Sequence, residues 1–599
     1  MQPFSTHISF AALFFASFAI AHGEDGSMDM DMGMSMPMQT AHSTASSTPV
    51  IPLNSHCESP MSYFACGKHS STIMAHIALM VVAWCFVLPA AVMLSIARSR
   101  LALPSQFLFL VLSAVGLLFG MIYKSQTPDL YENNAHGKIG WIATCMISAQ
   151  VALALIFSYD GRGASKLQPT SFERAALLPV ATREHESPDP TGAICENRWS
   201  RDSGQGTDCG SFIQSPGLSS CEVQSEYEGF DIPEESPVDS SEVSGLRAWL
   251  CRSVFGRLVS RRAPSIDSNC ILCIINGAQN LIGRIILPVG FVAIVTGAVT
   301  YGGIFRGKDI FNGLAHFIKG GIFFWYGILT LGRFIGAWAD LGWAWNKKPP
   351  ASIVGWKAKV PSGEFVESFV IWLYGITNVF LEHLSNPGGE WSAADMEHVS
   401  ISIMFFGGGL VGMLFESRRI RDTLNDTILR PPPHGSRNEK RQPPKSQGVP
   451  LNPMPALIIL LLGLMMGSHH QDSMKSTMVH KQWGNLLVGF ALARGMTYVL
   501  LFLRPQNSYL PARPPTEIVS GFCLIAGGLI FMLSTRNVIE AMEFYELDAM
   551  FTFTVAMGFT AFIMSLVVLN IALKAWAVQR EQRPQRNASF VLESQNTFF

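Results

Sequence analysis

Residues 72–97 read TIMAHIALMVVAWCFVLPAAVMLSIA, without a single Asp, Glu, Lys or Arg. A helix needs about 20 apolar residues to cross the hydrocarbon core of a bilayer, and this stretch is long enough. About eleven runs of similar character follow one another along the chain, and we expect each to be a transmembrane helix. They are residues 72–97, 105–123, 136–158, 281–304, 314–339, 365–384, 396–416, 451–467, 477–503, 517–534 and 549–573. The eighth run departs most from the pattern, because it is short and opens with Pro453 and Pro455.

The composition of the 599-residue chain agrees with many membrane spans. Hydrophobic residues make up 48% of the sequence and charged residues only 15%, which is too apolar for a set of large soluble domains. The formal net charge of -1 excludes the basic surface that nucleic-acid binding requires. The sequence therefore predicts an all-α, polytopic membrane protein whose main partner is the lipid bilayer.

The start of the chain predicts where the protein goes and how it is oriented. Residues 1–21 hold an apolar run that ends in Ala19-Ile20-Ala21, a small-x-small pattern typical of a cleaved signal peptide. We therefore expect a membrane of the secretory pathway, either the plasma membrane or a vacuolar or other endomembrane. Most Lys and Arg residues outside the spans then fall in cytosolic segments, as the positive-inside rule requires. This topology places the N-terminus on the exoplasmic side and the C-terminus in the cytosol.

The spans divide the chain into two helical bundles. Residues 22–71 form an exoplasmic, Met-rich segment in which a Cys57–Cys66 disulfide is expected. Residues 72–159 form a three-span domain, and residues 281–574 an eight-span domain. Between them, we interpret residues 160–280 as a disordered cytosolic linker. It is rich in Ser, Glu, Gly and Pro over residues 160–245 and has a basic amphipathic end. Residues 575–599 are a polar cytosolic tail.

Histidines collect at one predicted face of the membrane. The topology puts at the exoplasmic face His76, His136, His316, His383, His398, His469, His470 and His480. Histidine is uncommon inside membrane segments, and ring nitrogens gathered at one depth are what metal or haem ligation requires. The alternative for each of them is a ring that caps a helix end at the membrane interface.

The mature N-terminus carries methionine at every second position. The predicted ligands are His22, Met28, Met30, Met32, Met34, Met36 and Met38. Thioethers are soft ligands that select Cu(I), and an amino-terminal histidine offers an amine and an imidazole to Cu(II). The run resembles the Met-rich ectodomains of eukaryotic copper importers, which implies copper capture. The alternative is a low-complexity tail without a specific ligand.

The first three spans carry the spacing His76-x-x-x-Met80-x-x-x-Trp84 and the segment His136-x-x-x-Gly140. They resemble the cytochrome b-561 type transmembrane domain of ferric and ascorbate-linked reductases. The resemblance implies haem b with His76 and His136 as its axial ligands. Those reductases hold a second haem, but residues 105–123 contain no histidine, so one haem at most is expected. The alternative is again that both rings cap helix ends.

A third group of ligands lies in the later spans. Histidines near the exoplasmic helix ends, with carboxylates beside them, are candidates for copper, zinc or iron. They are His383, His398, His469, His470 and His480. With these residues, the chain from 281 onward resembles the C-terminal domain of the fungal Ytp-like multispanning membrane proteins, and the b-561-like part precedes it. That resemblance implies a two-part membrane architecture and no catalytic residue.

The sequence thus predicts a membrane protein that handles copper or another transition metal, with one bis-histidine haem. The alternative is a transporter or scaffold in which the histidines are structural.

Arginines inside spans need a separate explanation. Arg333 lies near a cytosolic helix end, where we expect its side chain to reach the interface. Arg494 lies deeper and needs an acid, a carbonyl or water as partner. Gly407, Gly408 and Gly409 and Gly527-Gly528 are expected to permit close helix packing.

Overall fold

The computed structural model describes residues 62–159, 269–307, 309–381, 391–428, 444, 448–469, 471 and 473–596. The predicted signal peptide, the Met-rich segment with its proposed copper ligands, and most of the linker lie outside these residues. Cys57, His383 and His470 lie outside them too. The described part of the chain is helical, and it contains no β-strand. The prediction of an all-α polytopic membrane protein is confirmed.

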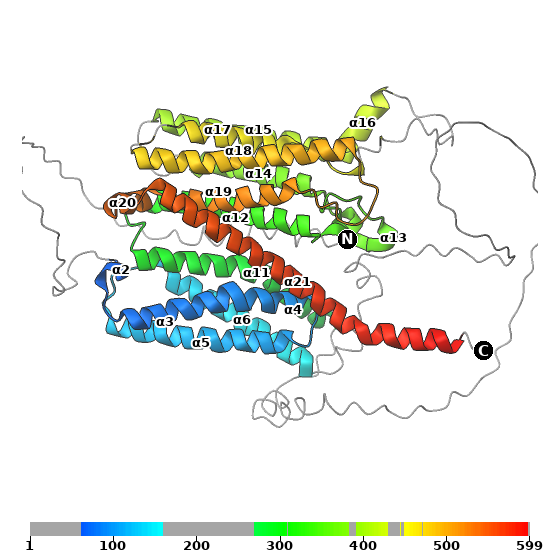
Figure 1. Ribbon diagram of the computed structural model, residues 1–599, viewed down its shortest axis with the longest axis horizontal. Coiled ribbons are helices and arrows are strands. Elements are labelled where there is room, and N and C mark those ends of the chain that lie inside the picture. Colours follow the sequence, from blue (N-terminus) through cyan, green and yellow to red (C-terminus); the bar gives the residue numbers. More distant parts are fainter. Residues whose placement is uncertain are drawn as a thin grey trace, which may run out of the picture. The chain divides into compact units, whose positions relative to one another are not determined.

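The N-terminal part holds the first three spans (Figure 1). The first span is built from α3 (Ser70–Val81), a π-helical turn (Val82–Val87) and α4 (Leu88–Ile96), and a short α2 (Tyr63–Cys66) precedes it. The π turn ends just before Pro89, which has no N–H to donate, so the wider turn absorbs the missing bond. The second and third spans are α5 (Ala102–Gln126) and α6 (Ala135–Tyr159).

The remaining spans follow the linker. They are α11 (Asn269–Gly302), α12 (Asp309–Ile335), α14 (Gly363–Leu381), α15 (Ala393–Glu416), α17 (Met454–Ser468), α18 (Met474–Leu503), α19 (Thr516–Leu533) and α21 (Ala549–Asn596). Shorter elements are Ala339–Leu341, α13 (Ala351–Val354), Gly355–Lys359, α16 (Arg418–Ile428) and α20 (Arg536–Phe544).

Every predicted span falls on one of these helices. In the described part of the chain, nine helices are long and apolar enough to cross a membrane. The eighth predicted span, α17, is shorter than those nine, as its sequence suggested. The sixth, α14, is not among the nine and carries Glu364 and Glu367 near its start. The predicted polar tail, residues 575–599, does not begin a separate element, because α21 continues through it as far as Asn596.

A first core lies in the N-terminal bundle, which we define as α3 to α6 together with α11. Trp84, Phe109, Ile147 and Ile286 are buried together, and the rings of Trp84 and Phe109 meet edge to face at 5.1 Å. Ile286 belongs to α11, so this helix contributes to the core of the three preceding spans. The sequence grouped α11 with the later spans. In the structure it is the fourth helix around the first core.

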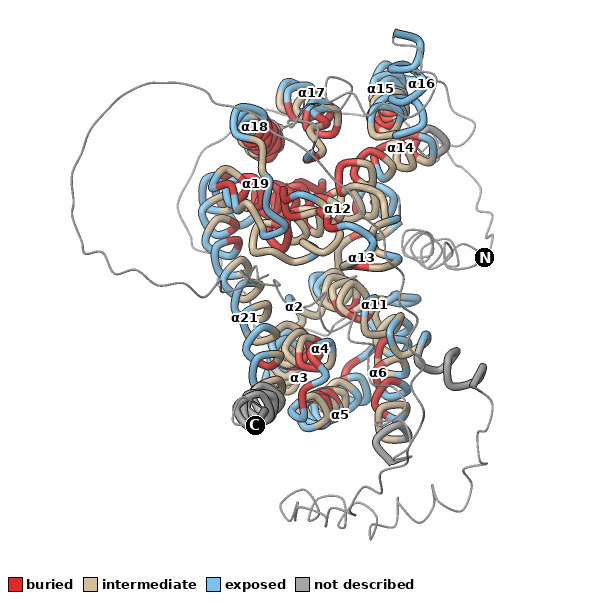
Figure 2. The backbone as a smooth tube through the Cα atoms, turned by 90° about the vertical axis from the view of Figure 1, so that its right-hand side faces the viewer, coloured by how far each residue is buried: buried red, intermediate tan, exposed pale blue. Residues whose placement is uncertain are grey.

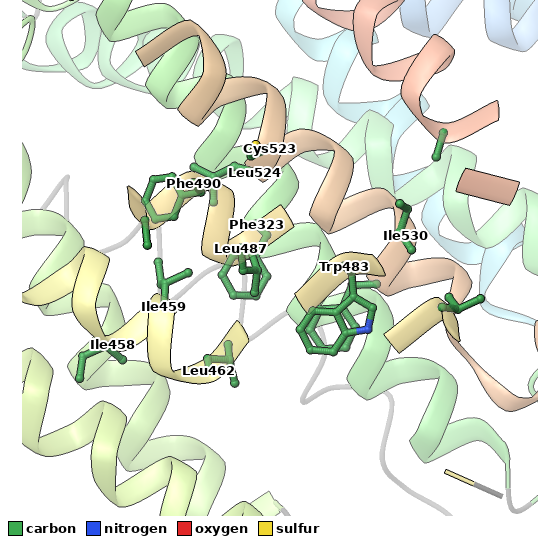
Figure 3. Close-up of a cluster of buried hydrophobic side chains, with 14 of the residues drawn as sticks. Phe323, Ile458, Ile459, Leu462, Trp483, Leu487, Phe490, Cys523, Leu524 and Ile530 are labelled. Atoms are coloured by element: carbon green, nitrogen blue, oxygen red, sulfur yellow. The ribbon is translucent and has the colours of Figure 1, made fainter. Parts of the chain in front are cut away.

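A second core lies in the C-terminal bundle, which we define as α12, α14, α15, α17, α18 and α19. Figure 3 shows the side chains of Trp483, Leu487 and Phe490 in this core, beside Leu524. Buried residues concentrate on α12, α18 and α19 (Figure 2). Helices α12 and α19 approach closely, since a Cβ placed on Gly528 would come within 2.5 Å of the Gly320 carbonyl oxygen. The predicted role of this glycine in close packing is confirmed.

The last span contacts helices of both bundles. Helix α21 packs against α4 and against α19. The ring centroids of Phe562 and of Phe86 in the first span are 6.1 Å apart. Ala577 of α21 also forms a small buried cluster with Leu94 and Ala97. Much of α21 is exposed along its length (Figure 2), as expected for a helix that faces lipid.

Candidate functional site

The two histidines predicted to bind haem face each other inside the N-terminal bundle. His76 lies on α3 and His136 near the start of α6. Their ring centroids are 6.4 Å apart, and the ring planes are nearly perpendicular at 80°. An imidazole nitrogen binds a metal ion at about 2.0–2.1 Å, so two rings on opposite sides of one ion have centroids roughly 6 Å apart. The separation of His76 and His136 matches that requirement.

Backbone carbonyls fix the orientation of both rings. His76 Nδ1 lies 2.8 Å from the carbonyl oxygen of Gly116 on α5, and His136 Nδ1 lies 3.1 Å from that of Ala293 on α11. A carbonyl oxygen only accepts, so each Nδ1 carries the proton and donates it. Each Nε2 is then left with a lone pair. This is the tautomer that a metal-ligating histidine adopts when an outer partner holds its other nitrogen.

Two glycines make room for these rings. A Cβ on Gly120 of α5 would come within 2.8 Å of His76 Nδ1, and one on Gly297 of α11 within 3.0 Å of His136 Cε1. A larger residue at position 120 would force the His76 ring to shift, and one at position 297 would crowd the His136 ring. The separation of the two rings and the partners of their Nδ1 atoms therefore suit axial ligation of one iron ion, and α11 supplies half of these partners.

The end of the bundle nearest these histidines is tied down by the segment between α5 and α6. Tyr131 donates a 2.8 Å hydrogen bond to the carbonyl of Ile304, just beyond the end of α11. The Arg306 guanidinium lies over the Tyr131 ring and donates to the Leu130 carbonyl at 2.7 Å. Burial raises the pKa of the Tyr131 hydroxyl, so it stays protonated as a donor. These contacts join the segment that follows α11 to the segment that precedes α6.

A second imidazole pair lies in the C-terminal bundle. His316 on α12 and His480 on α18 have ring centroids 6.1 Å apart and perpendicular planes. Each Nδ1 lies 2.8 Å from the backbone carbonyl one turn earlier in its own helix, at Asn312 and Ser476. Unlike the first pair, these rings sit among large aromatic side chains, with Phe531 5.5 Å from His316. Phe531 in turn stacks on Trp483 at 4.2 Å.

The other predicted metal ligands are brought together only in part. His398 and His469 have ring centroids 6.5 Å apart, and His469 Nδ1 lies 3.0 Å from a carboxylate oxygen of Glu397. His383 and His470 fall outside the described residues. Where the structure describes the chain, no three His, Cys, Asp or Glu side chains are arranged so that they could hold a metal ion.

A network of buried charges is the feature that the sequence did not predict as a unit. Arg333 of α12 pairs with Glu364 and Glu367 of α14, at 2.6 Å and 2.5 Å. Arg494 of α18 pairs with Glu367 at 3.3 Å and with Glu517 of α19 at 2.8 Å. All five side chains are 5% exposed or less. Four helices are thus joined by one set of ion pairs.

The network settles two predictions about arginines. Arg494 does pair with acids, as its depth required. The expectation that Arg333 reaches the interface is wrong, because its side chain is 1% exposed and also donates a 2.6 Å hydrogen bond to the Trp343 carbonyl. The segment after α12 folds back over it, and the Trp345 ring lies 4.3 Å from the guanidinium. The available signal was the pair of glutamates at the start of a predicted span, spaced to share a helix face.

These features define a class: an α-helical polytopic membrane protein with a histidine pair in one bundle and a buried ion network in the other. The comparisons with known proteins agree. Residues 57–160 match a domain of unknown function, DUF2427, and residues 289–575 match the family described as Protein YTP1-like, C-terminal.

Similar proteins are known from two yeasts. The chain is 35% identical over 518 residues to the uncharacterized membrane protein C3B8.06 of Schizosaccharomyces pombe, covering 85% of this chain and 94% of the relative. It is 37% identical over 324 residues to the uncharacterized membrane protein YCR061W of Saccharomyces cerevisiae, about half of each protein (51% and 49%). Protein YTP1 of Saccharomyces cerevisiae is 26% identical over 243 residues, 41% of this chain and 42% of that protein. The chain belongs to the YTP1-like family of membrane proteins. No solved structure matches it.

Proposed function

We propose that this membrane protein holds a single haem b between His76 and His136. The observation that carries the proposal is the pair of rings, whose centroids are 6.4 Å apart. Each Nδ1 donates a hydrogen bond to a backbone carbonyl, so each Nε2 keeps a lone pair for a metal ion. When bound, a six-coordinate haem supplies a centre that takes up and gives back one electron. The b-561-like spacing of the first three spans supports the same assignment.

The chain's own residues have defined tasks in this proposal. Gly116 and Ala293 orient the ligand rings through their carbonyls, and Gly120 and Gly297 let the helices approach them. Trp84 of the first span, two turns after His76, packs against Phe109 of α5 in the apolar core of this bundle. An apolar shell of this kind limits the access of water to a redox centre and so influences its potential.

The test is the visible spectrum of the purified, reduced protein. We expect low-spin b-type bands that are lost in His76→Ala and in His136→Ala, because six-coordinate iron needs both axial rings. His316→Ala is the matched control: it removes a ring with a comparable neighbour and hydrogen bond, and should leave the bands unchanged. A colourless wild-type protein from haem-replete cells contradicts the proposal.

Copper or another transition metal at the exoplasmic face is a second proposed ligand. The alternating run Met28 to Met38 after His22 supports Cu(I) capture. The imidazoles of His398 and His469 lie near each other, with Glu397 beside His469, but these three side chains do not form a metal site by themselves. The proposed receiving site therefore requires His383, His470 or His480 as further ligands. Zinc and iron suit the same imidazole and carboxylate set.

The proposed orientation places the N-terminus on the exoplasmic side of a secretory-pathway membrane and the C-terminus in the cytosol. The basic residues Arg418, Arg419 and Arg421 at the start of α16 support it. The sequons at Asn425 and Asn587 should then stay unglycosylated, while a sequon engineered into residues 40–56 should be modified. Glycan at either native site contradicts this orientation.

A further inference from the structure

A pocket of about 320 Å³ lies where two spans of the C-terminal bundle end. Its lining comes from the end of α15, the first turn of α16, the end of α18 and the segment that leads into α17, and it includes Phe415, Glu416, Arg421, Phe502 and residues 449–453. His398 and the other proposed metal ligands lie at the opposite end of this bundle, because His398 is near the start of α15. The pocket is therefore a separate site.

One wall of the pocket is fixed by its own hydrogen bonds. The buried Asn452 donates to the Gly412 carbonyl of α15 at 2.9 Å, and its side-chain oxygen accepts from the Met454 backbone N–H at 3.1 Å. Pro450 and Pro453 restrict the backbone before and after it. This wall keeps its shape without a ligand.

The pocket holds one acid and one base that do not form an ion pair with each other. Glu416 is half-buried, and its Oε2 accepts a 2.8 Å hydrogen bond from the Ser362 hydroxyl. Arg421 is exposed, and within the described part of the chain its guanidinium has neither an ion pair nor a hydrogen bond. Two opposite charges that line one pocket without pairing suit a ligand that carries both charges.

The rim of the pocket faces the lipid. Phe415 and Phe502 are each 61% exposed, and they lie at the ends of helices long enough to cross a membrane. Aromatic rings in this position meet the acyl chains and headgroups of the neighbouring lipids. A molecule that enters the pocket from this side is therefore part of the bilayer.

Helix α16 places Arg421 at the depth of the headgroups. Helix α15 ends at Ser417, whose backbone is extended, and α16 begins at the next residue (Figure 1). Ile420, Leu424 and Ile428 are exposed and recur every fourth residue, so they share one face of α16. A helix of this kind beside a span end rests on the bilayer with its apolar face in the lipid. Arg421 borders that face, since it lies one turn before Leu424.

We propose that this pocket binds the headgroup of phosphatidylethanolamine, with the ammonium group on Glu416 and the phosphate on Arg421. A primary ammonium donates hydrogen bonds to a carboxylate, and an arginine fork matches phosphate oxygens. One acid and one base balance the two charges of this zwitterionic lipid. Its acyl chains pass over Phe415 and Phe502 into the bilayer. The proposal does not rest on the haem, on copper or on the orientation of the chain.

Native mass spectrometry of the delipidated full-length protein tests the proposal. The protein is titrated with phosphatidylethanolamine, phosphatidylcholine and phosphatidylglycerol that have the same acyl chains. We expect one phosphatidylethanolamine to bind about tenfold more tightly than either of the others, because choline has no N–H to donate and glycerol has no positive charge. Equal binding of the three lipids, or a preference for either of the others, overturns the proposal. Binding of free phosphoethanolamine with the same affinity identifies a soluble ligand and also overturns it.

Variants show whether the lipid lies in this pocket. Arg421→Gln should weaken phosphatidylethanolamine binding about tenfold, because it removes a charged hydrogen bond, and should keep the wild-type unfolding midpoint, because the side chain is exposed. Glu416→Gln should abolish the preference over phosphatidylglycerol. Arg419→Gln is the matched control, since it removes the same charge from the same helix outside the pocket lining. Unchanged binding in the two pocket variants, or an equal loss in Arg419→Gln, contradicts the proposal.

Discussion

The two bundles hold their buried polar side chains in different ways. In the N-terminal bundle, His76 and His136 are each held by one backbone carbonyl, and each ring keeps a nitrogen free for a ligand. In the C-terminal bundle, Arg333 and Arg494 form ion pairs with buried glutamates, so each charged group is a partner of another. A one-sided bond positions a donor for something else. In a reciprocal network the charged side chains serve mainly as partners for one another.

The sharpest way to break this contrast is to remove Glu367, the carboxylate shared by both arginines. We expect Glu367→Ala to lower the free energy of unfolding by about 3–5 kcal/mol, because it leaves buried guanidinium groups without their partner. The measurement is thermal or denaturant unfolding of the purified protein in detergent. The control Glu540→Ala removes an exposed i,i+4 pair with Arg536 and should cost a few tenths of a kcal/mol, roughly the value of such pairs. Similar losses in the two variants contradict a structural role for the network.

A smaller effect is expected where two helices of the C-terminal bundle touch through glycine. Gly528→Ala places a methyl group against the Gly320 carbonyl of α12, and we expect a loss of about 1–3 kcal/mol as the helices separate. Gly407→Ala is the matched control, since a Cβ there meets nothing within 4 Å, so the predicted role of this glycine in close helix packing is wrong. Its stability should stay within about 0.5 kcal/mol of the wild type. An equal loss of stability in Gly407→Ala would contradict the account that Gly528 allows α12 and α19 to approach closely.

No effect on stability is expected from the Met-rich segment. Replacing its six methionines with leucine keeps their bulk but removes the sulfur lone pairs, so we expect Cu(I) binding by the full-length protein to be lost while the unfolding midpoint is unchanged. Titration with a Cu(I)-specific competitor measures the binding of copper, and thermal unfolding measures the midpoint. Unchanged copper binding means that the methionines are not the ligands.

The helical architecture could be predicted from the sequence because each span is a long apolar run. Length and hydropathy are properties of a single segment, and the bilayer imposes them on every helix alike. The pairing of His76 with His136 was also within reach, since both lie near the start of helices with the same predicted direction. The partners of these rings were not, because Gly116 and Ala293 contribute only backbone carbonyls, which every residue has.

Relations between distant segments could not be predicted. Arg333 was expected at the interface because it ends a span, and only the segment after α12, with Trp343 and Trp345, reveals that it is covered. Three predicted spans lie between Glu367 and Glu517 along the chain, and no local pattern joins these two glutamates. The contribution of α11 to the first core was hidden for the same reason, since the linker separates α11 from the helices it packs on.

The proposed function requires one haem per chain, in the N-terminal bundle. The most direct test is the amount of haem b per polypeptide in the purified protein, determined from the pyridine haemochrome spectrum and the protein concentration. The account predicts one haem per chain, lost in His136→Ala and retained in His480→Ala. A protein without haem, or with two haems of which one depends on His480, contradicts it.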